Sequence, residues 1–265
     1  MATLENLSLT AGIAVVALSA LFSIITLFSK SKSDRWGMIL SVLALLLITL
    51  SLVARITQTG RGPFSNMYEF SVAFSWGIIT MSIYFQWRFK APAVKVVGLL
   101  VAFALLLFAI NLSSKPVPLV PALQQGFLLS VHVACAIIAY GTFTLGFGSA
   151  ILFLVQNRNA KSWLPTAETL DSMSYHSVVI GFPFLTLTII LGALWADIAW
   201  GRYWGWDPKE TASLVTWLLY AAYLHARIMR GWRGTKAATL LIIGFAAVLF
   251  TFFGNYIFSG LHAYG

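Results

Sequence analysis

Apolar residues form eight long runs along the chain, separated by short stretches that carry charge, proline or glycine. The runs cover approximately residues 11–29, 36–54, 69–87, 94–111, 126–156, 176–196, 211–230 and 237–259. Each run has about the ~20 residues that an α-helix needs to cross a bilayer, and none alternates with the period of two that a barrel strand requires. The pattern predicts an all-α, polytopic integral membrane protein with about eight transmembrane helices.

The composition agrees with this fold class and excludes others. Of 265 residues, 59% are hydrophobic and only 9% are charged, whereas soluble domains carry roughly 25% charged residues. This balance excludes a separate soluble domain and nucleic-acid binding. The single cysteine, Cys135, excludes an intramolecular disulfide and a thiolate metal cluster. Any redox chemistry therefore has to come from a bound cofactor or from a partner.

The basic residues are distributed unequally between the two sets of connections. Twelve of the 17 lysines and arginines fall on one side: Lys30, Lys32, Arg35, Arg88, Lys90, Lys95, Arg158, Lys161, Arg227, Arg230, Arg233 and Lys236. The remaining five fall on the other side: Arg55, Arg61, Lys115, Arg202 and Lys209. Since an excess of Lys and Arg marks the cytoplasmic face, both termini are predicted on the outer face. The N-terminus has Glu5 but no basic start typical of a signal peptide, so we expect the first run to be a retained anchor.

The connection at residues 195–210 is unusually aromatic. It contains Trp195, Trp200, Trp204 and Trp206, four of the ten tryptophans, together with Tyr203. One interpretation is an interfacial belt of aromatic side chains at headgroup level. The other is a binding site, because rings interleaved with glycines suit a flat apolar ligand that approaches the backbone closely.

The end of this connection predicts the start of the seventh helix. Asp207, Pro208 and Glu210 have the spacing of an acidic N-cap, a proline at the first helical position and a capping box. A structural role is therefore the favoured interpretation of Asp207. Arg202 and Lys209 are candidates to pair with carboxylates of a ligand, and the simpler alternative is that both are solvated.

Two of the four histidines are predicted at the outer face, at the level of the aromatic connection. His132 lies about two turns into the fifth helix, and His262 follows the eighth. Two neutral imidazoles beside a group of aromatic rings suit bis-histidine haem ligation. Taken alone, His132 could instead form a hydrogen bond between helices, and His262 could simply be a residue of the C-terminal tail.

The other two histidines are predicted in the inner half. His225 lies ~22 Å beyond Glu210 along the seventh helix, and an ionisable residue at such depth is a functional candidate. A hydrogen bond to a backbone carbonyl is the structural alternative. His176 begins the sixth helix and is interpreted as interfacial.

Several motifs together resemble one family. The segment Trp200-Gly-Arg-Tyr-Trp-Gly-Trp-Asp-Pro-Lys-Glu-Thr211, with Thr216-Trp217 and Tyr223-Leu-His-Ala-Arg227, resembles the tryptophan-rich WWD signature of haem-handling proteins in cytochrome c biogenesis. Its WDPKET form is similar to the CcsA/ResC branch, named CcsB in some bacteria. Four shorter stretches agree: Asn66-Met-Tyr-Glu69, Ser130-Val-His132, Ile180-Gly-Phe-Pro183 and Gly260-Leu-His262.

The resemblance implies a site and a function. Haem b would be held by His132 and His262 over the WWD loop, which supplies Trp200, Arg202, Tyr203, Trp204, Trp206 and Asp207, and His225 would ligate haem within the membrane. The haem would be attached to Cys-x-x-Cys-His of apocytochrome c on the outer, periplasmic or lumenal face. The chain would then be a subunit of a cytochrome c haem lyase complex.

The resemblance also implies partners and a location. A ResB/CcsB-type membrane subunit would supply a further histidine, and a thioredoxin-like thiol reductant would act upstream. The expected location is a bacterial inner membrane, or alternatively a thylakoid membrane. The motifs divide the chain into a two-helix segment, 1–65, and a haem-handling membrane domain, 66–265.

Other functions remain open at this level. A two-haem b-type electron-transfer subunit would use all four histidines, with His225 and His176 on the inner side. A substrate transporter is less compatible, because neither an inverted repeat nor a clear midplane polar site is evident. A haem chaperone without a ligation step shares the same residues with the lyase.

Overall fold

The computed structural model describes residues 2–29, 33–116 and 126–257, and all of its regular structure is helical. Eight helices follow one another in these ranges: α1 (Ala2–Phe28), α2 (Arg35–Thr59), α3 (Met67–Phe89), α4 (Pro92–Ile110), α5 (Gly126–Arg158), α6 (Ala167–Trp200), α7 (Pro208–Met229) and α8 (Thr235–Ile257). This arrangement confirms the prediction of an all-α, polytopic fold.

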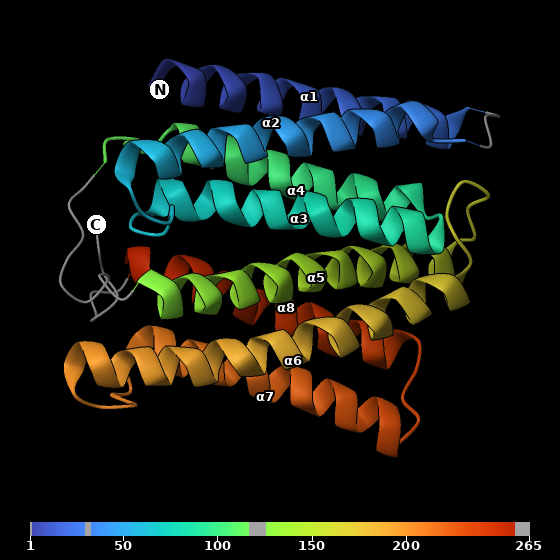
Figure 1. Cartoon of the computed structure of the whole chain (residues 1–265). Coiled ribbons are helices and arrows are strands. Elements are labelled where there is room, and N and C mark those ends of the chain that lie inside the picture. The colour runs from blue at the N-terminus through green and yellow to red at the C-terminus, as the bar shows by residue number, and fades with distance from the viewer. Residues whose placement is uncertain (1, 30–32, 117–125, 258–265) are drawn as a thin grey trace.

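The helices run up and down, so that successive connections alternate between the two ends of one bundle (Figure 1). The α1–α2 hairpin packs on α3 and α4, α5 contacts α3, α6 and α8, and α7 packs on α6 and α8. One end carries residues 60–66 and 201–207, and we call it the aromatic end. The other carries residues 90–91, 159–166 and 230–234, and we call it the basic end.

Six of the described helices are long and apolar enough to span a membrane: α1, α2, α4, α5, α6 and α8. The other two, α3 and α7, are richer in polar residues. More than half of the residues of α3 are buried against other helices, so its serines and Glu69 face protein. The chain is thus a multi-pass membrane protein in which the less apolar helices are accommodated within the bundle.

Small residues bring α3 and α5 into close contact. A Cβ atom added at Gly141 would lie 3.0 Å from the carbonyl oxygen of Gly77, and one added at Gly77 would overlap the side chain of Ile137. Close backbone approach at glycine is a common way to pack helices in membranes. It fixes α5, which carries His132, against α3.

Several helix boundaries differ from the sequence prediction. α6 begins at Ala167, so His176, which was expected at the start of the sixth helix, lies within it. α1 begins at Ala2 instead of near residue 11, because the polar side chain of Glu5 has buried partners on neighbouring helices. α6 continues to Trp200 and ends where Gly201 adopts a left-handed φ of 71°. The predicted aromatic connection is therefore helical up to Trp200, and only residues 201–207 form a loop.

A buried ionic cluster joins three helices at the aromatic end. The guanidinium of Arg55 on α2 lies 2.8 Å from the carboxylate of Glu69 on α3 and 3.5 Å from that of Glu5 on α1. Arg61 lies 3.0 Å from the other Glu69 oxygen, which also accepts hydrogen bonds from the backbone and hydroxyl of Ser65. The partners of Arg55 and Glu69 could not be identified from the sequence, and the structure shows that each is buried and paired with the other.

Two further ion pairs lie towards the basic end. Lys95 on α4 is fully buried and pairs with Asp34, which precedes α2. Arg227 on α7 donates to both carboxylate oxygens of Asp171 on α6, at 2.8 Å each. Two of the residues that the charge distribution assigned to connections therefore hold helices together.

Replacing Glu69 by Gln should destabilise the bundle by about 3 kcal/mol, because the Arg55 and Arg61 guanidinium groups would lose a buried counter-charge. The measurement is the free energy of unfolding in detergent. Arg158→Gln, at an exposed arginine, is the matched control and should change stability by less than about 0.5 kcal/mol. Equal stability of the two variants would contradict a structural role for the cluster.

Candidate functional site

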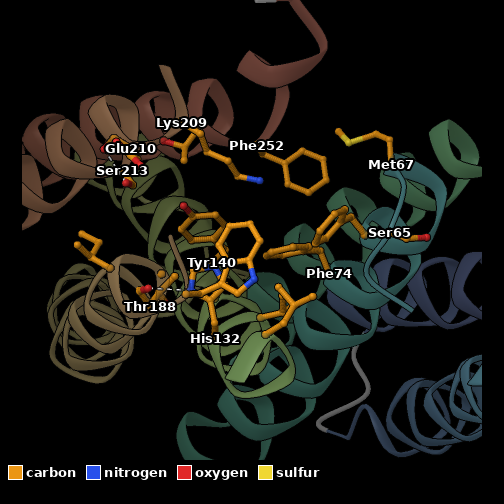
Figure 2. Close-up of a pocket in the computed structure, with 18 of the residues that line it drawn as sticks. Ser65, Met67, Phe74, His132, Tyr140, Thr188, Lys209, Glu210, Ser213 and Phe252 are labelled. Carbon is orange, nitrogen blue, oxygen red and sulfur yellow. Dashed lines mark hydrogen bonds between the residues drawn. The ribbon is translucent and has the colours of Figure 1, made fainter. Parts of the chain in front are cut away.

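A cavity of about 350 Å³ opens at the aromatic end between α3, α5, α6, α7 and α8. This volume falls in the range of roughly 300–1,000 Å³ that is usual for ligand sites. The walls are mostly apolar and aromatic, and they include the polar residues Ser65, Asn66, Ser113, His132, Thr188, Lys209, Glu210, Ser213 and Thr251. Figure 2 shows His132, Thr188 and Lys209 around the cavity, on α5, α6 and α7.

His132 of α5 lies in the cavity wall and has a fixed orientation. Its Nδ1 lies 2.8 Å from the backbone carbonyl oxygen of Thr188 on α6. Because a carbonyl only accepts hydrogen bonds, Nδ1 carries the proton and Nε2 carries the lone pair. Gly192 provides the space for the ring, since a Cβ there would lie 2.8 Å from Cε1 of His132. This tautomer is the one that ligates metals through Nε2.

The loop at residues 201–207 covers one side of the cavity. Tyr203 and Trp204 are among the lining residues. Trp206 is 69% exposed and has a positive φ of 55°, and its ring packs edge-on against Trp204 with centroids 5.8 Å apart. The buried indole nitrogen of Trp204 has no hydrogen-bond acceptor among the described residues, so a donor N–H remains for a ligand.

The last turns of α6 support this loop. Trp195 is buried and lines the cavity. The ring of Trp200 packs against it at 4.8 Å with an interplanar angle of 73°. Trp200 thus supports a wall residue and is not itself among the residues that line the cavity.

The predicted capping box is present at the start of α7. The Asp207 carboxylate accepts from the backbone N–H of Lys209 at 2.9 Å, and the Glu210 carboxylate accepts from those of Asp207 and Gly205, at 3.2 and 2.8 Å. Both carboxylates therefore hold the backbone where the loop meets the helix, and Asp207 has a clear structural role.

The two cations of this region have different surroundings. The guanidinium of Arg202 is exposed and packs on Gly205, where a Cβ would lie 2.9 Å from Arg202 Cζ. Lys209 lines the cavity, and its ammonium lies 5.4 Å from the centroid of the Phe70 ring on α3. Burial lowers the pKa of Lys209 to about 8, partly offset by the Asp207 carboxylate.

The ionic cluster reaches the cavity through Tyr68. The Tyr68 hydroxyl donates to the Glu5 carboxylate at 3.0 Å, and the residue also lines the cavity next to Ser65 and Asn66. Sequence reasoning missed Tyr68, Thr188 and Gly192 as parts of this site. The Asn66-Met-Tyr-Glu69 motif was the only sequence feature that could have indicated Tyr68. Thr188 and Gly192 lie in an apolar run in which no motif marks them.

The remaining histidines are not brought together with His132 in the described ranges. His225 is exposed on α7, seventeen residues after Pro208 and outside the cavity lining. His176 is exposed on α6, with its ring 5.5 Å from that of Phe89 and Nδ1 2.8 Å from the carbonyl oxygen of Ser172. His262 lies outside the described residues. Within those residues, no group of three or more His, Cys, Asp or Glu could hold a metal ion.

Fold and cavity together define a class: a polytopic helical membrane protein with a mostly apolar, aromatic cavity at one end. The family described as "Cytochrome C assembly protein" matches residues 64–262. The chain belongs to this family.

Individual relatives cover most of the chain. The "Cytochrome c biogenesis protein CcsA" of Trieres chinensis is 34% identical over 99% of this chain and 97% of its own length. The proteins of the same name from Guillardia theta and Chlamydomonas reinhardtii are 37% and 38% identical, over 85% and 93% of this chain and 84% and 73% of theirs. The solved "Cytochrome c Heme Lyase CcmF" has the same fold, with a TM-score of 0.71 at 19% identity, over 95% of this chain and 46% of that one.

Asp207→Ala should cost about 1 kcal/mol of stability because the N-cap hydrogen bond to Lys209 is lost. Asp207→Asn should be nearly neutral, since asparagine caps helices equally well. Thermal unfolding in detergent checks both variants. A large loss of stability in the Asn variant would show that the negative charge, instead of the hydrogen bond, is what the site needs.

Proposed function

We propose that the protein handles haem in cytochrome c biogenesis. In this proposal the cavity receives haem b as its substrate, with His132 as one axial ligand and His262 from the C-terminal tail as the other. The haem is presented there to the Cys-x-x-Cys-His segment of apocytochrome c. The protein acts in a haem lyase complex with a ResB/CcsB-type membrane subunit, and a thioredoxin-like reductant keeps the substrate thiols reduced.

The orientation of His132 is the observation that carries the proposal. The hydrogen bond from Nδ1 to the Thr188 carbonyl leaves the lone pair on Nε2, in a cavity whose other walls are mostly apolar. A histidine ligand to haem has this second hydrogen bond in many proteins, and the bond fixes the ring and raises its basicity.

The surrounding residues fit a porphyrin. Trp195, Tyr203 and Trp204 provide aromatic surface, which suits the flat apolar faces of the macrocycle. Haem supplies the vinyl groups to which the two substrate thiols add. The contribution of this chain is to shield, ligate and orient the haem, so that catalysis rests mainly on positioning.

We propose a separate role for His225, in binding haem within the membrane. Its exposed position on α7 makes it accessible to a partner helix, and we propose that it ligates haem in the membrane together with a histidine of the ResB/CcsB-type subunit.

By the positive-inside rule the aromatic end faces the periplasm or lumen of a bacterial inner or thylakoid membrane. We propose 66–265 as the haem-handling domain and 1–65 as a helical segment that supports it.

His132→Ala should lower the haem content of the purified complex and change its visible spectrum, and added imidazole should partly restore the spectrum. Absorption spectra with and without the ResB-type subunit measure this. Unchanged haem in a His132/His262 double alanine variant would contradict the proposal. Retained haem that accepts electrons reversibly from quinol would instead favour the b-type electron-transfer subunit.

Gly192→Ala should weaken haem binding by about 1–3 kcal/mol without removing any ligand, because the new methyl group displaces the His132 ring. The control is Gly148→Ala on α5, where a Cβ would lie 2.9 Å from Val97 but ~24 Å along the helix from His132. Equal haem affinity in the two variants would contradict the role of Gly192.

A further inference from the structure

Lys209 places a positive charge inside an otherwise mostly apolar cavity. Its side chain comes from the first turn of α7, and its ammonium lies over the ring of Phe70 on α3, at 5.4 Å. Figure 2 shows the nitrogen pointing inward, towards Phe252 on α8. The charge therefore faces the space that a ligand would occupy.

No carboxylate among the described residues forms an ion pair with this ammonium. The two nearest in sequence, Asp207 and Glu210, accept hydrogen bonds from the backbone of the loop and of the first helical turn. A cation in apolar surroundings is unfavourable unless a counter-charge offsets its loss of water. The pKa of Lys209 is lowered by burial because the Asp207 carboxylate offsets this effect only in part. A ligand carboxylate at this position would remove the cost.

We infer that Lys209 binds a propionate group of the haem and thereby sets the orientation of the porphyrin in the cavity. This inference rests on the proposed function. Haem carries its two carboxylates on one edge, so an ion pair at α7 directs that edge towards Lys209. The opposite part of the ring, with the vinyl groups, then faces away from α7, and His132 approaches the iron from α5. The indole N–H of Trp204 is a second donor in the same wall.

The structure separates Lys209 from Arg202. From the sequence, both are candidates to pair with a ligand carboxylate, and the resemblance placed only Arg202 in the haem site. Arg202 is exposed and its guanidinium packs on the Gly205 backbone, outside the residues that line the cavity. Arg202→Met therefore removes a positive charge seven residues from Lys209 without changing a residue that lines the cavity. It is the matched control for Lys209→Met.

The experiment compares the affinity of the purified complex for haem and for haem dimethyl ester, in which both propionates are uncharged. Wild-type protein and Arg202→Met should prefer haem over the ester by about tenfold or more, the size of a charge-assisted hydrogen bond. Lys209→Met should bind the two ligands alike, and Lys209→Arg should keep the preference. Lys209→Gln repeats the test with a polar side chain in case the Met variant does not fold.

The pH dependence provides a second readout. A lysine with a pKa of about 8 is charged below that pH, so the preference for haem over the ester should fall as the pH rises from 7 to 9.5. Lys209→Arg should keep its preference over the whole range, because the guanidinium stays protonated. The other titratable lining groups are Glu210, His132 and tyrosines 68, 140 and 203, and all of them are present in Lys209→Arg, so the comparison isolates the titration of residue 209.

The outcomes separate the inference from the function on which it rests. If wild-type protein binds both porphyrins equally well and Lys209→Met changes neither affinity, the inference is wrong while the haem site stands. If Arg202→Met abolishes the preference and Lys209→Met does not, the propionate lies at the loop surface and the inference is also wrong. If wild-type protein binds neither porphyrin, the proposed function itself fails.

Discussion

The Glu69 carboxylate is the interaction on which much of the aromatic end depends. It has no exposed side-chain surface, and it pairs with Arg55 from α2 and Arg61 from the following loop while accepting two hydrogen bonds from Ser65. A buried carboxylate is stable only when its charge is matched in this way. The same contacts fix residues 61–66 and, through the neighbouring Tyr68, one wall of the cavity. Charge pairing in the N-terminal half thus positions apolar surface for a ligand.

The helices could be predicted from the sequence because each apolar run has the length of a membrane span, but the partners of individual polar residues could not. Lys95 and Arg55 have the same local setting as lysines and arginines that face water. Their burial depends on Asp34 and Glu69, which are distant in the sequence. Likewise, the tryptophan-rich pattern predicted an aromatic segment correctly, but α6 continues to Trp200 and ends at Gly201, which adopts a left-handed φ.

The residues of the candidate site could likewise be predicted from the sequence only in part. His132, Tyr203 and Trp204 are recognisable from residue type and motif, and all three line the cavity. The roles of Thr188 and Gly192 depend on how α6 lies beside α5, which no local pattern encodes. The difference between Lys209 and Arg202 is a matter of side-chain direction. Residues seven apart in one basic, aromatic segment therefore contribute differently, one to the cavity and one to the loop surface.

The position of Glu5 has a consequence for how the protein is made. Its side-chain partners, Arg55, Gln58 and Tyr68, all follow it in the chain, and Asp34 likewise precedes its partner Lys95. Arg55 and Gln58 are synthesised with α2, whereas Tyr68 and Lys95 are synthesised only with α3 and α4. An unpaired carboxylate is costly in a membrane. Glu5 and Asp34 therefore have their complete set of partners only after α3 and α4 have been inserted. Assembly of the N-terminal hairpin is thereby completed by later parts of the chain, in the same step that brings Tyr68 to the cavity wall.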